Sequence, residues 1–99
     1  MPREMTSPIL HLSLPVRELA ESIEFYVDVM GCEIGRVRDS FVDVWFFGMQ
    51  VTLHEVPDQV EPPREHGVRH FGVTLDADGM DAILKRIGGR RVTIVSKLA

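Results

Sequence analysis

The sequence predicts a single α+β domain in which one unit containing a strand and a helix is used twice. An apolar run that alternates like a strand, at residues 9–16, leads directly into a helical pattern, and a similar run at residues 68–75 does the same. His11 and His70 lie near the start of these two runs. This self-similarity indicates a repeated structural unit, and 99 residues leave room for one hydrophobic core.

The first unit, about residues 9–56, is expected to have the order βαβββ. Residues 9–16 place Leu12, Leu14 and Val16 on the opposite side from His11, as in a strand with one face against helices. Residues 17–30 repeat apolar side chains at helical spacing and are followed by Gly31, which favours a helix C-terminus. Three β-rich runs separated by turn residues then predict an antiparallel meander, at residues 32–38, 41–47 and 49–56.

The second unit, about residues 68–96, is expected to have the order βαβ. Residues 57–67 hold three prolines and several charges and predict a surface connection between the units. A strand at 68–75, a helix at 78–87 that ends at Gly88-Gly89, and a last strand at 91–96 follow. The second unit is therefore two strands shorter than the first, which makes it an incomplete copy.

Composition narrows the classes of partner. The net charge of −4 argues against nucleic acid and anionic membrane surfaces, which both favour clustered Lys and Arg. Cys32 is the single cysteine, so an intramolecular disulfide is excluded, and no apolar run approaches the ~20 residues that span a bilayer. We therefore expect a cytoplasmic protein that binds neither nucleic acid nor membrane.

Three histidines are the candidate metal ligands. Strand alternation places His11, His54 and His70 on the face of the sheet that points away from the helices, whereas Glu55 is expected on the helix side. A strand histidine is often only hydrogen-bonded or exposed, but the matching positions of His11 and His70 in the two units favour a shared site. Such a set would suit a divalent ion, namely Fe, Zn, Mn, Ni or Co.

The same alternation predicts a surface for a small-molecule substrate. Asp43, Trp45 and Phe47 are expected on the face that carries the histidines, so that an aromatic floor with one carboxylate would meet the ligand. Trp45 could equally fill the cleft or meet a partner subunit. The sequence contains no glycine-rich phosphate loop and no motif of a serine or cysteine nucleophile.

The chain resembles the vicinal oxygen chelate superfamily, which includes glyoxalase I, bleomycin and fosfomycin resistance proteins and extradiol dioxygenases. The resemblance covers roughly residues 9–96. The residues that carry it are 11–19, Phe25-Tyr26, Met30-Gly31-Cys32, 42–48 with Gln50 and His54, and His70-Phe71-Gly72.

This resemblance implies paired βαβββ modules whose curled sheets enclose a divalent metal. The metal would chelate two adjacent oxygens of the substrate and stabilise negative charge. His11 and His70 match the first-strand ligand positions of the two modules, and His54 matches the last-strand position of the first. A further carboxylate ligand, normally near the end of the second module, would lie beyond Ala99.

Three functions stay open at this point. The first is a metal-dependent enzyme, dioxygenase-like or glyoxalase-like, that acts on a small oxygenated organic molecule. The second is a metal-free protein of the bleomycin-resistance type that sequesters a small molecule, and the third is an inactive truncated relic. A homodimer is expected in each case, because a sheet edge and part of a concave face would otherwise stay uncovered.

Overall fold

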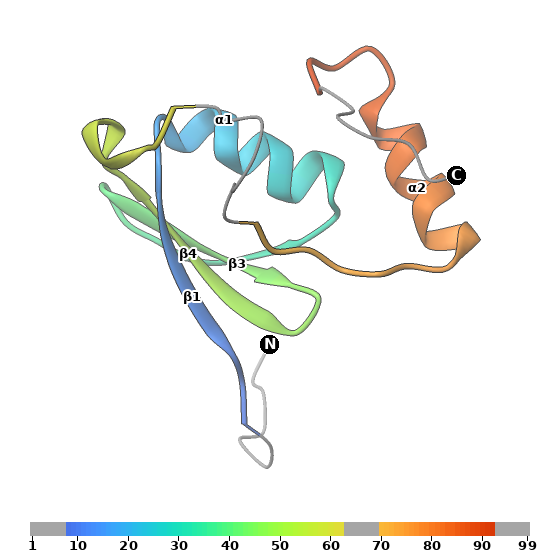
Figure 1. Ribbon diagram of the computed structural model, residues 1–99, viewed down its shortest axis with the longest axis horizontal. Coiled ribbons are helices and arrows are strands. Elements are labelled where there is room, and N and C mark those ends of the chain that lie inside the picture. Colours follow the sequence, from blue (N-terminus) through green and yellow to red (C-terminus); the bar gives the residue numbers. More distant parts are fainter. Residues whose placement is uncertain (1–7, 63–69, 93–99) are drawn as a thin grey trace.

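The computed structural model describes residues 8–62 and 70–92 and confirms the α+β class. A four-stranded sheet is covered on one face by a helix, and a second helix lies to one side of this layer (Figure 1). The elements in chain order are β1 His11–Val16, α1 Leu19–Ile23, η1 Glu24–Val29, β2 Glu33–Val37, β3 Phe41–Phe46, β4 Met49–Glu55, η2 Pro57–Gln59 and α2 Ala77–Ile87.

The sheet has the order β1-β4-β3-β2. Strands β2, β3 and β4 form the predicted antiparallel meander, and β1 pairs with β4 in parallel. The hairpin between β3 and β4 has a two-residue loop, because Phe46 pairs with Met49. Phe47 and Gly48 in this loop have φ angles of 50° and 89°, as in the turn type that matches the twist of paired strands. The strand therefore ends at Phe46, one residue earlier than predicted.

One continuous helix, formed by α1 and η1, crosses the sheet. It starts at Leu19, two residues later than predicted, because Glu18 has an extended backbone. The carboxylate of Glu55, at the end of β4, accepts a hydrogen bond of 2.9 Å from the Leu19 backbone N–H. Glu55 thus lies on the helix side, as predicted, and offsets the positive end of the helix dipole. The helix ends before Gly31, which has a φ of 78° and confirms the predicted terminus.

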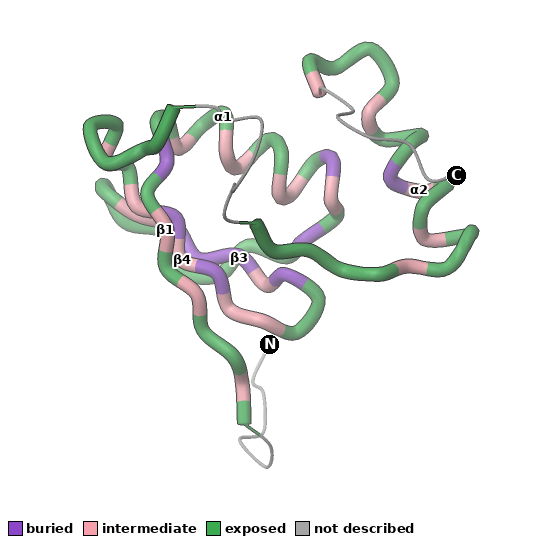
Figure 2. The backbone as a smooth tube through the Cα atoms, viewed as in Figure 1, coloured by how far each residue is buried: buried purple, intermediate pink, exposed green. Residues whose placement is uncertain are grey.

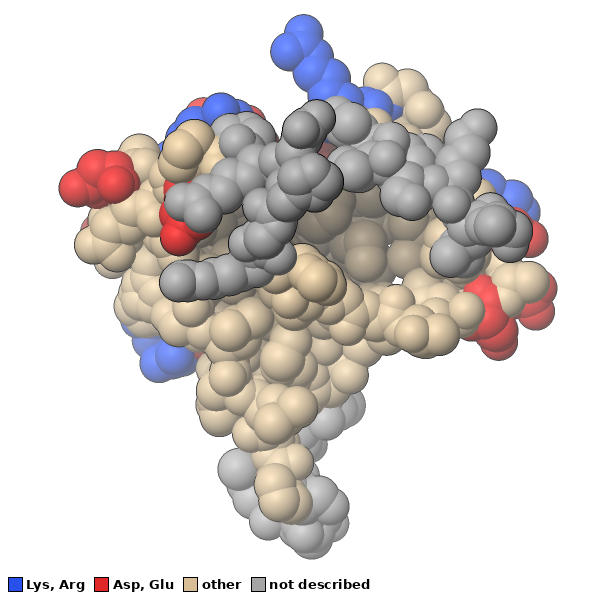
Figure 3. Space-filling view, viewed as in Figure 1, with Lys and Arg blue, Asp and Glu red and all other residues tan. Residues whose placement is uncertain are grey.

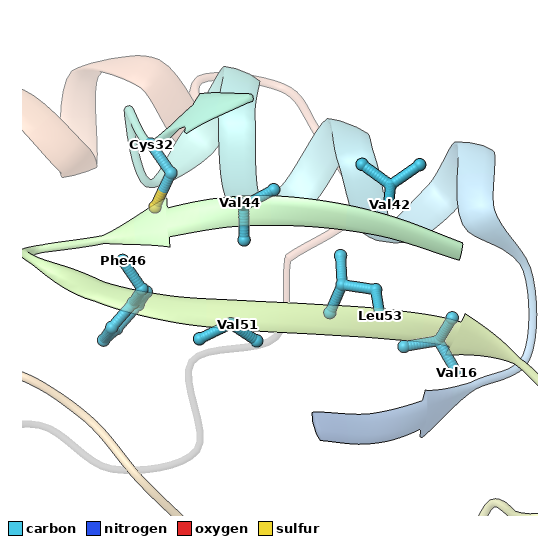
Figure 4. Close-up of a cluster of buried hydrophobic side chains, with 7 residues drawn as sticks. All are labelled: Val16, Cys32, Val42, Val44, Phe46, Val51 and Leu53. Carbon is cyan, nitrogen blue, oxygen red and sulfur yellow. The ribbon is translucent and has the colours of Figure 1, made fainter. Parts of the chain in front are cut away.

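The core lies between the sheet and this helix (Figure 2). Alternate residues of β3 and β4 point into it, which confirms the predicted alternation on both strands. The close-up in Figure 4 labels the buried side chains of the cluster, which are Val16, Cys32, Val42, Val44, Phe46, Val51 and Leu53. Burial of this apolar area is the main driving force for folding of the first unit.

The second unit differs from its prediction. Residues 70–76 form neither strand nor helix, so the strand predicted at 68–75 is wrong for its described part. They run as an extended segment to α2 (Figure 1), and a strand requires a hydrogen-bonded neighbour, which this segment lacks within residues 8–62 and 70–92. Arg91 and Val92 are likewise not in a strand. Residues 68–69 and 93–96 of the two predicted strands lie outside the described residues.

Helix α2 confirms the predicted second helix and starts one residue earlier. Its N-terminus is capped by Asp76, whose carboxylate accepts a hydrogen bond of 2.8 Å from the Gly79 N–H. Only Ile83 of this helix is buried, whereas Met80 and Leu84 of the predicted apolar stripe stay exposed. No helix within the described parts of the chain is both long and apolar enough to cross a membrane.

Arginines attach the end of α2 to η1. Arg86 donates a hydrogen bond of 3.3 Å to the Val29 carbonyl, and Arg90 lies 2.7 Å from Glu24 and 3.8 Å from Asp28. Exposed ion pairs of this kind contribute about 0–1 kcal/mol each. The second unit is therefore held to the first by these polar contacts, by burial of Ile83 and by Phe71, whose ring stacks on Tyr26 at 6.5 Å and lies 5.2 Å from the ring of Phe46.

Truncation of one leucine in each unit will compare how much the packing of each unit contributes to the free energy of unfolding. Leu53→Ala, in the fully buried core, is expected to lower the free energy of unfolding by ~2–5 kcal/mol. Leu84→Ala, at a side chain with 47% exposure, should change it by less than about 0.5 kcal/mol. Urea unfolding followed by circular dichroism measures both. Equal losses for the two variants would show that α2 is packed as firmly as the sheet.

Candidate functional site

The sheet has a second face, here called the open face, which points away from α1 and η1. Residues paired across neighbouring strands point to the same side of a sheet. The register therefore arranges the open face in three rows. The first row is His11, Gln50, Trp45 and Glu33, the middle row is Ser13, Thr52 and Asp43, and the third row is Pro15, His54 and Phe41.

Asp43 is the centre of the open face and is 1% exposed. Its Oδ1 accepts a hydrogen bond of 2.6 Å from the Thr52 hydroxyl. Its Oδ2 accepts one of 2.5 Å from Arg36 Nε and one of 3.2 Å from the Gln50 amide. These donors come from β2 and β4, so the carboxylate connects three adjacent strands.

These contacts decide the charge of Asp43. Burial raises the pKa of its carboxyl, but the hydrogen bonds from Arg36, Thr52 and Gln50 and the charge of Arg36 together outweigh burial and hold the pKa below its ordinary value. The carboxylate therefore stays ionised at neutral pH, and three donors already occupy its two oxygens. It is suited to positioning its neighbours rather than to accepting a proton from a ligand.

A bulge in β2 brings Arg36 to this face. The pairing of β2 with β3 shifts between Ile34 and Val37, so that Gly35 and Arg36 together oppose the single residue Asp43. A side chain at position 35 would place its Cβ 3.1 Å from the Asp43 Cβ, so glycine permits this close approach. Regular alternation would direct Arg36 to the helix side. The sequence analysis therefore missed it, although a glycine inside a strand is a known sign of a bulge.

The predicted metal ligands lie in different places. His11 is in the first row and His54 in the third. The two rows are four residues apart along the paired strands, which corresponds to a separation of about 13 Å at ~3.3 Å per residue. His70 lies outside the sheet, in the extended segment before α2. Residues 8–62 and 70–92 contain no group of three or more His, Cys, Asp or Glu side chains that could hold a metal ion. The structure does not bring the three histidines together within one chain, and their role as ligands of one ion stays a prediction.

The three residues predicted to bind substrate lie in different environments. Trp45 is half-buried in the first row beside Gln50. Phe47 lies in the hairpin loop, where its ring packs edge-on against the buried Phe46 at a centroid distance of 5.0 Å. Asp43 is on the open face, as predicted, but it is enclosed by its hydrogen-bond donors. Trp45 is therefore the one of the three that is placed to meet a ligand on this face.

Two hollows lie elsewhere, between η1 and the second unit. The larger, of about 570 Å³, is lined by α1 and η1, by Val16 at the end of β1 and by residues 89–92. The smaller, of about 320 Å³, is apolar and is lined by aromatic rings that include Tyr26, Phe46 and Phe71. Figure 3 shows uncharged side chains over the middle of this view and charged ones around its margin. None of the residues predicted to bind metal or substrate lines either hollow.

Comparison with known proteins agrees with the arrangement of the sheet and its helix. A glyoxalase/bleomycin resistance protein/dioxygenase from Alicyclobacillus acidocaldarius is 30% identical, with a TM-score of 0.75 over 93% of this chain and 70% of its own. The fosfomycin resistance protein FosX from Listeria monocytogenes shares the fold at 18% identity, with a TM-score of 0.72 over 96% of this chain and 74% of its own. The oxidase ChaP-H2 shares it at 21% identity, with a TM-score of 0.62 over 84% of this chain and 61% of its own.

No curated protein sequence matches the chain. The model of the Glyoxalase/Bleomycin resistance protein/Dioxygenase superfamily, however, matches residues 8–99. This match covers more than nine-tenths of the sequence, and it agrees with the meander, the crossing helix and the similar structures. The chain therefore belongs to the Glyoxalase/Bleomycin resistance protein/Dioxygenase superfamily.

Proposed function

We propose that this chain binds a small organic molecule on the open face of its sheet, in a homodimer whose second copy covers that face. The observation that carries the proposal is the buried carboxylate of Asp43, held there by three donors. A sheet face that only meets water does not need an enclosed, fully hydrogen-bonded charge, which is costly to bury. Such a network keeps the surrounding polar groups in fixed positions, as a binding site requires.

Coverage by a second copy is supported by the exposed apolar residues around the sheet. β1 and β2 are its edge strands in the described chain. Leu10 before β1, Ile34 and Val37 on β2 and Phe47 in the hairpin loop are exposed large apolar residues at the margins of the sheet. Ile34 and Val37 pair with Val44 and Val42, so they lie on the helix side of the edge strand, beside the open face rather than on it. Edges and apolar patches of this kind are commonly covered in native assemblies. A ligand between the open faces of two copies would be enclosed, whereas the open face of one copy would leave it in contact with water.

A second candidate is the metal-dependent enzyme expected from the resemblance, with His11, His54 and His70 as ligands. Members of the superfamily commonly use divalent metals, and the pairing of His11 with Gln50 places two possible donors side by side at one end of the open face. The separation of His11 from His54 means that the residues of one chain do not fit a complete three-histidine site. This candidate therefore needs donors from a second copy, and metal-free binding is the function that the geometry favours.

Trp45 provides the test of binding, because it is the only tryptophan and lies on the open face. We expect catechol and similar small oxygenated compounds to change its fluorescence saturably, under conditions where light scattering gives twice the 11.2 kDa mass of the chain. Gln50→Ala, beside Trp45, should weaken binding about tenfold, the cost expected for one well-formed polar contact.

Gln59→Ala is the matched control, since Gln59 is an exposed glutamine in η2, away from the open face. It should leave binding unchanged. A monomer that shows no saturable response to any compound would contradict the proposal.

Metal titration distinguishes the two candidates. For metal-free binding, calorimetry with Zn²⁺ and tag-free protein should show no stoichiometric site, and catechol binding should persist in excess chelator. Stoichiometric Zn²⁺ binding that is lost in both His11→Ala and His54→Ala, but kept in His66→Ala, would instead support the metal-dependent enzyme. His66 lies outside the described residues and serves as the control histidine.

Acid unfolding will show that Asp43 supports the fold. Because the folded pKa of Asp43 is lowered, its stabilisation is complete above the ordinary carboxyl pKa and is lost as the pH falls through the folded value. Asp43→Asn should cost about 1–3 kcal/mol at pH 7 and should flatten the loss of stability below about pH 4. Asp39→Asn, at an exposed carboxylate in the preceding turn, is the control for charge alone. An unchanged pH profile in Asp43→Asn would contradict the assignment.

A further inference from the structure

We infer that Arg36 gives the open face a subsite for the carboxylate group of its ligand, an inference that rests on the proposed binding function. The subsite is formed by Arg36 on β2, Phe41 on β3 and His54 on β4. Arg36 opposes Asp43 of the middle row, and its guanidinium lies against the ring of Phe41, which pairs with His54 in the third row. No residue of this group belongs to the first row, where Trp45 and His11 lie. The ligand would thus be held at two ends of the face by different chemistry.

The guanidinium of Arg36 is fixed in position from two sides. Its Nε donates to the buried carboxylate of Asp43. Its Cζ lies 5.2 Å from the centre of the Phe41 ring, in the geometry of a cation–π contact. An arginine held by both contacts has lost most of its rotamer freedom before any ligand binds. Ligand binding therefore loses less side-chain conformational entropy than it would at a freely rotating arginine.

The remaining donors of this guanidinium are available to a ligand. Among the described residues, the hydrogen bond of Arg36 to protein is made by Nε alone, and its side chain is 57% exposed. Nη1 and Nη2 form the outer edge of a planar group whose spacing matches the two oxygens of a carboxylate. The Phe41 and His54 rings, 5.5 Å apart between centroids and tilted by 40° to each other, offer two aromatic surfaces to the body of the same ligand.

Charge balance determines what kind of recognition this subsite provides. Asp43 neutralises the charge of Arg36, so the pair attracts a distant anion only weakly. Recognition then depends on two directed hydrogen bonds at short range, which a lysine in the same place could not make. We therefore expect selectivity for a planar carboxylate over an uncharged group of the same shape.

Benzoate and benzamide are suitable probes, because they share size and shape and differ in charge. In ¹H–¹⁵N spectra of the intact chain, benzoate should shift the Arg36 Nε–H signal and the amides of residues 36–43 saturably, and benzamide should not. Arg36→Lys should weaken benzoate binding by about tenfold or more, as expected for loss of a charge-assisted hydrogen bond. The double variant Arg36→Gln with Asp43→Asn should abolish it without leaving a buried charge unpaired.

Arg38→Gln is the matched control, since Arg38 is exposed just after β2 and donates to the Val37 carbonyl. It should bind benzoate as the unmodified chain does. Equal losses in Arg38→Gln and Arg36→Lys would show only general attraction to positive charge and would overturn the inference, as would equal binding of benzamide. If benzoate fails while catechol still changes Trp45 fluorescence, the carboxylate subsite is wrong and the proposed function stands. If both fail, the proposed function is wrong as well.

Discussion

A charge buried in a sheet requires partners in fixed places, and Asp43 imposes this constraint on β2, β3 and β4. Its two oxygens receive hydrogen bonds from Arg36, Gln50 and Thr52, so the three strands are joined by side chains as well as by their backbone ladders. Removing one donor would leave part of a charge unsatisfied, at a cost of several kcal/mol if the charge were wholly uncompensated. The bulge at Gly35 and the orientation of Arg36 both serve this carboxylate.

The two faces of the sheet consequently differ in kind. The helix face is filled by apolar side chains, and its contact with the helix is strengthened where Glu55 caps the Leu19 N–H. The open face is a polar network with aromatic rings at both ends, Trp45 at one and Phe41 at the other. This division explains why the same sheet can be stable on one side and available for binding on the other.

Membership of the superfamily identifies the fold of this chain more closely than it identifies the ligand or reaction. The chain spans 61–74% of the length of the three similar proteins described above. Within the described residues the first module is present with its strands and crossing helix, whereas the second contributes α2 and an extended segment. The binding proposal therefore rests on the open face of the first module, and a complete metal site would need donors that one chain does not bring together.

Most local features of this protein follow from its amino-acid pattern. Alternation identified which residues of β1, β3 and β4 face the core, and Gly31, Gly48 and Gly88 marked the ends of helices and the hairpin turn, because these features depend on neighbours along the chain. Glu55 was assigned to the helix side for the same reason.

Features that depend on pairing between distant segments could be read only from the folded chain. The register separates His11 from His54 by four residues, a relation that alternation within each strand cannot reveal. Residues 70–75 carry a strand-like pattern but have no partner strand within the described chain, so propensity alone did not produce a strand. Arg36 reaches the open face through a bulge that exists because two residues of β2 oppose one of β3.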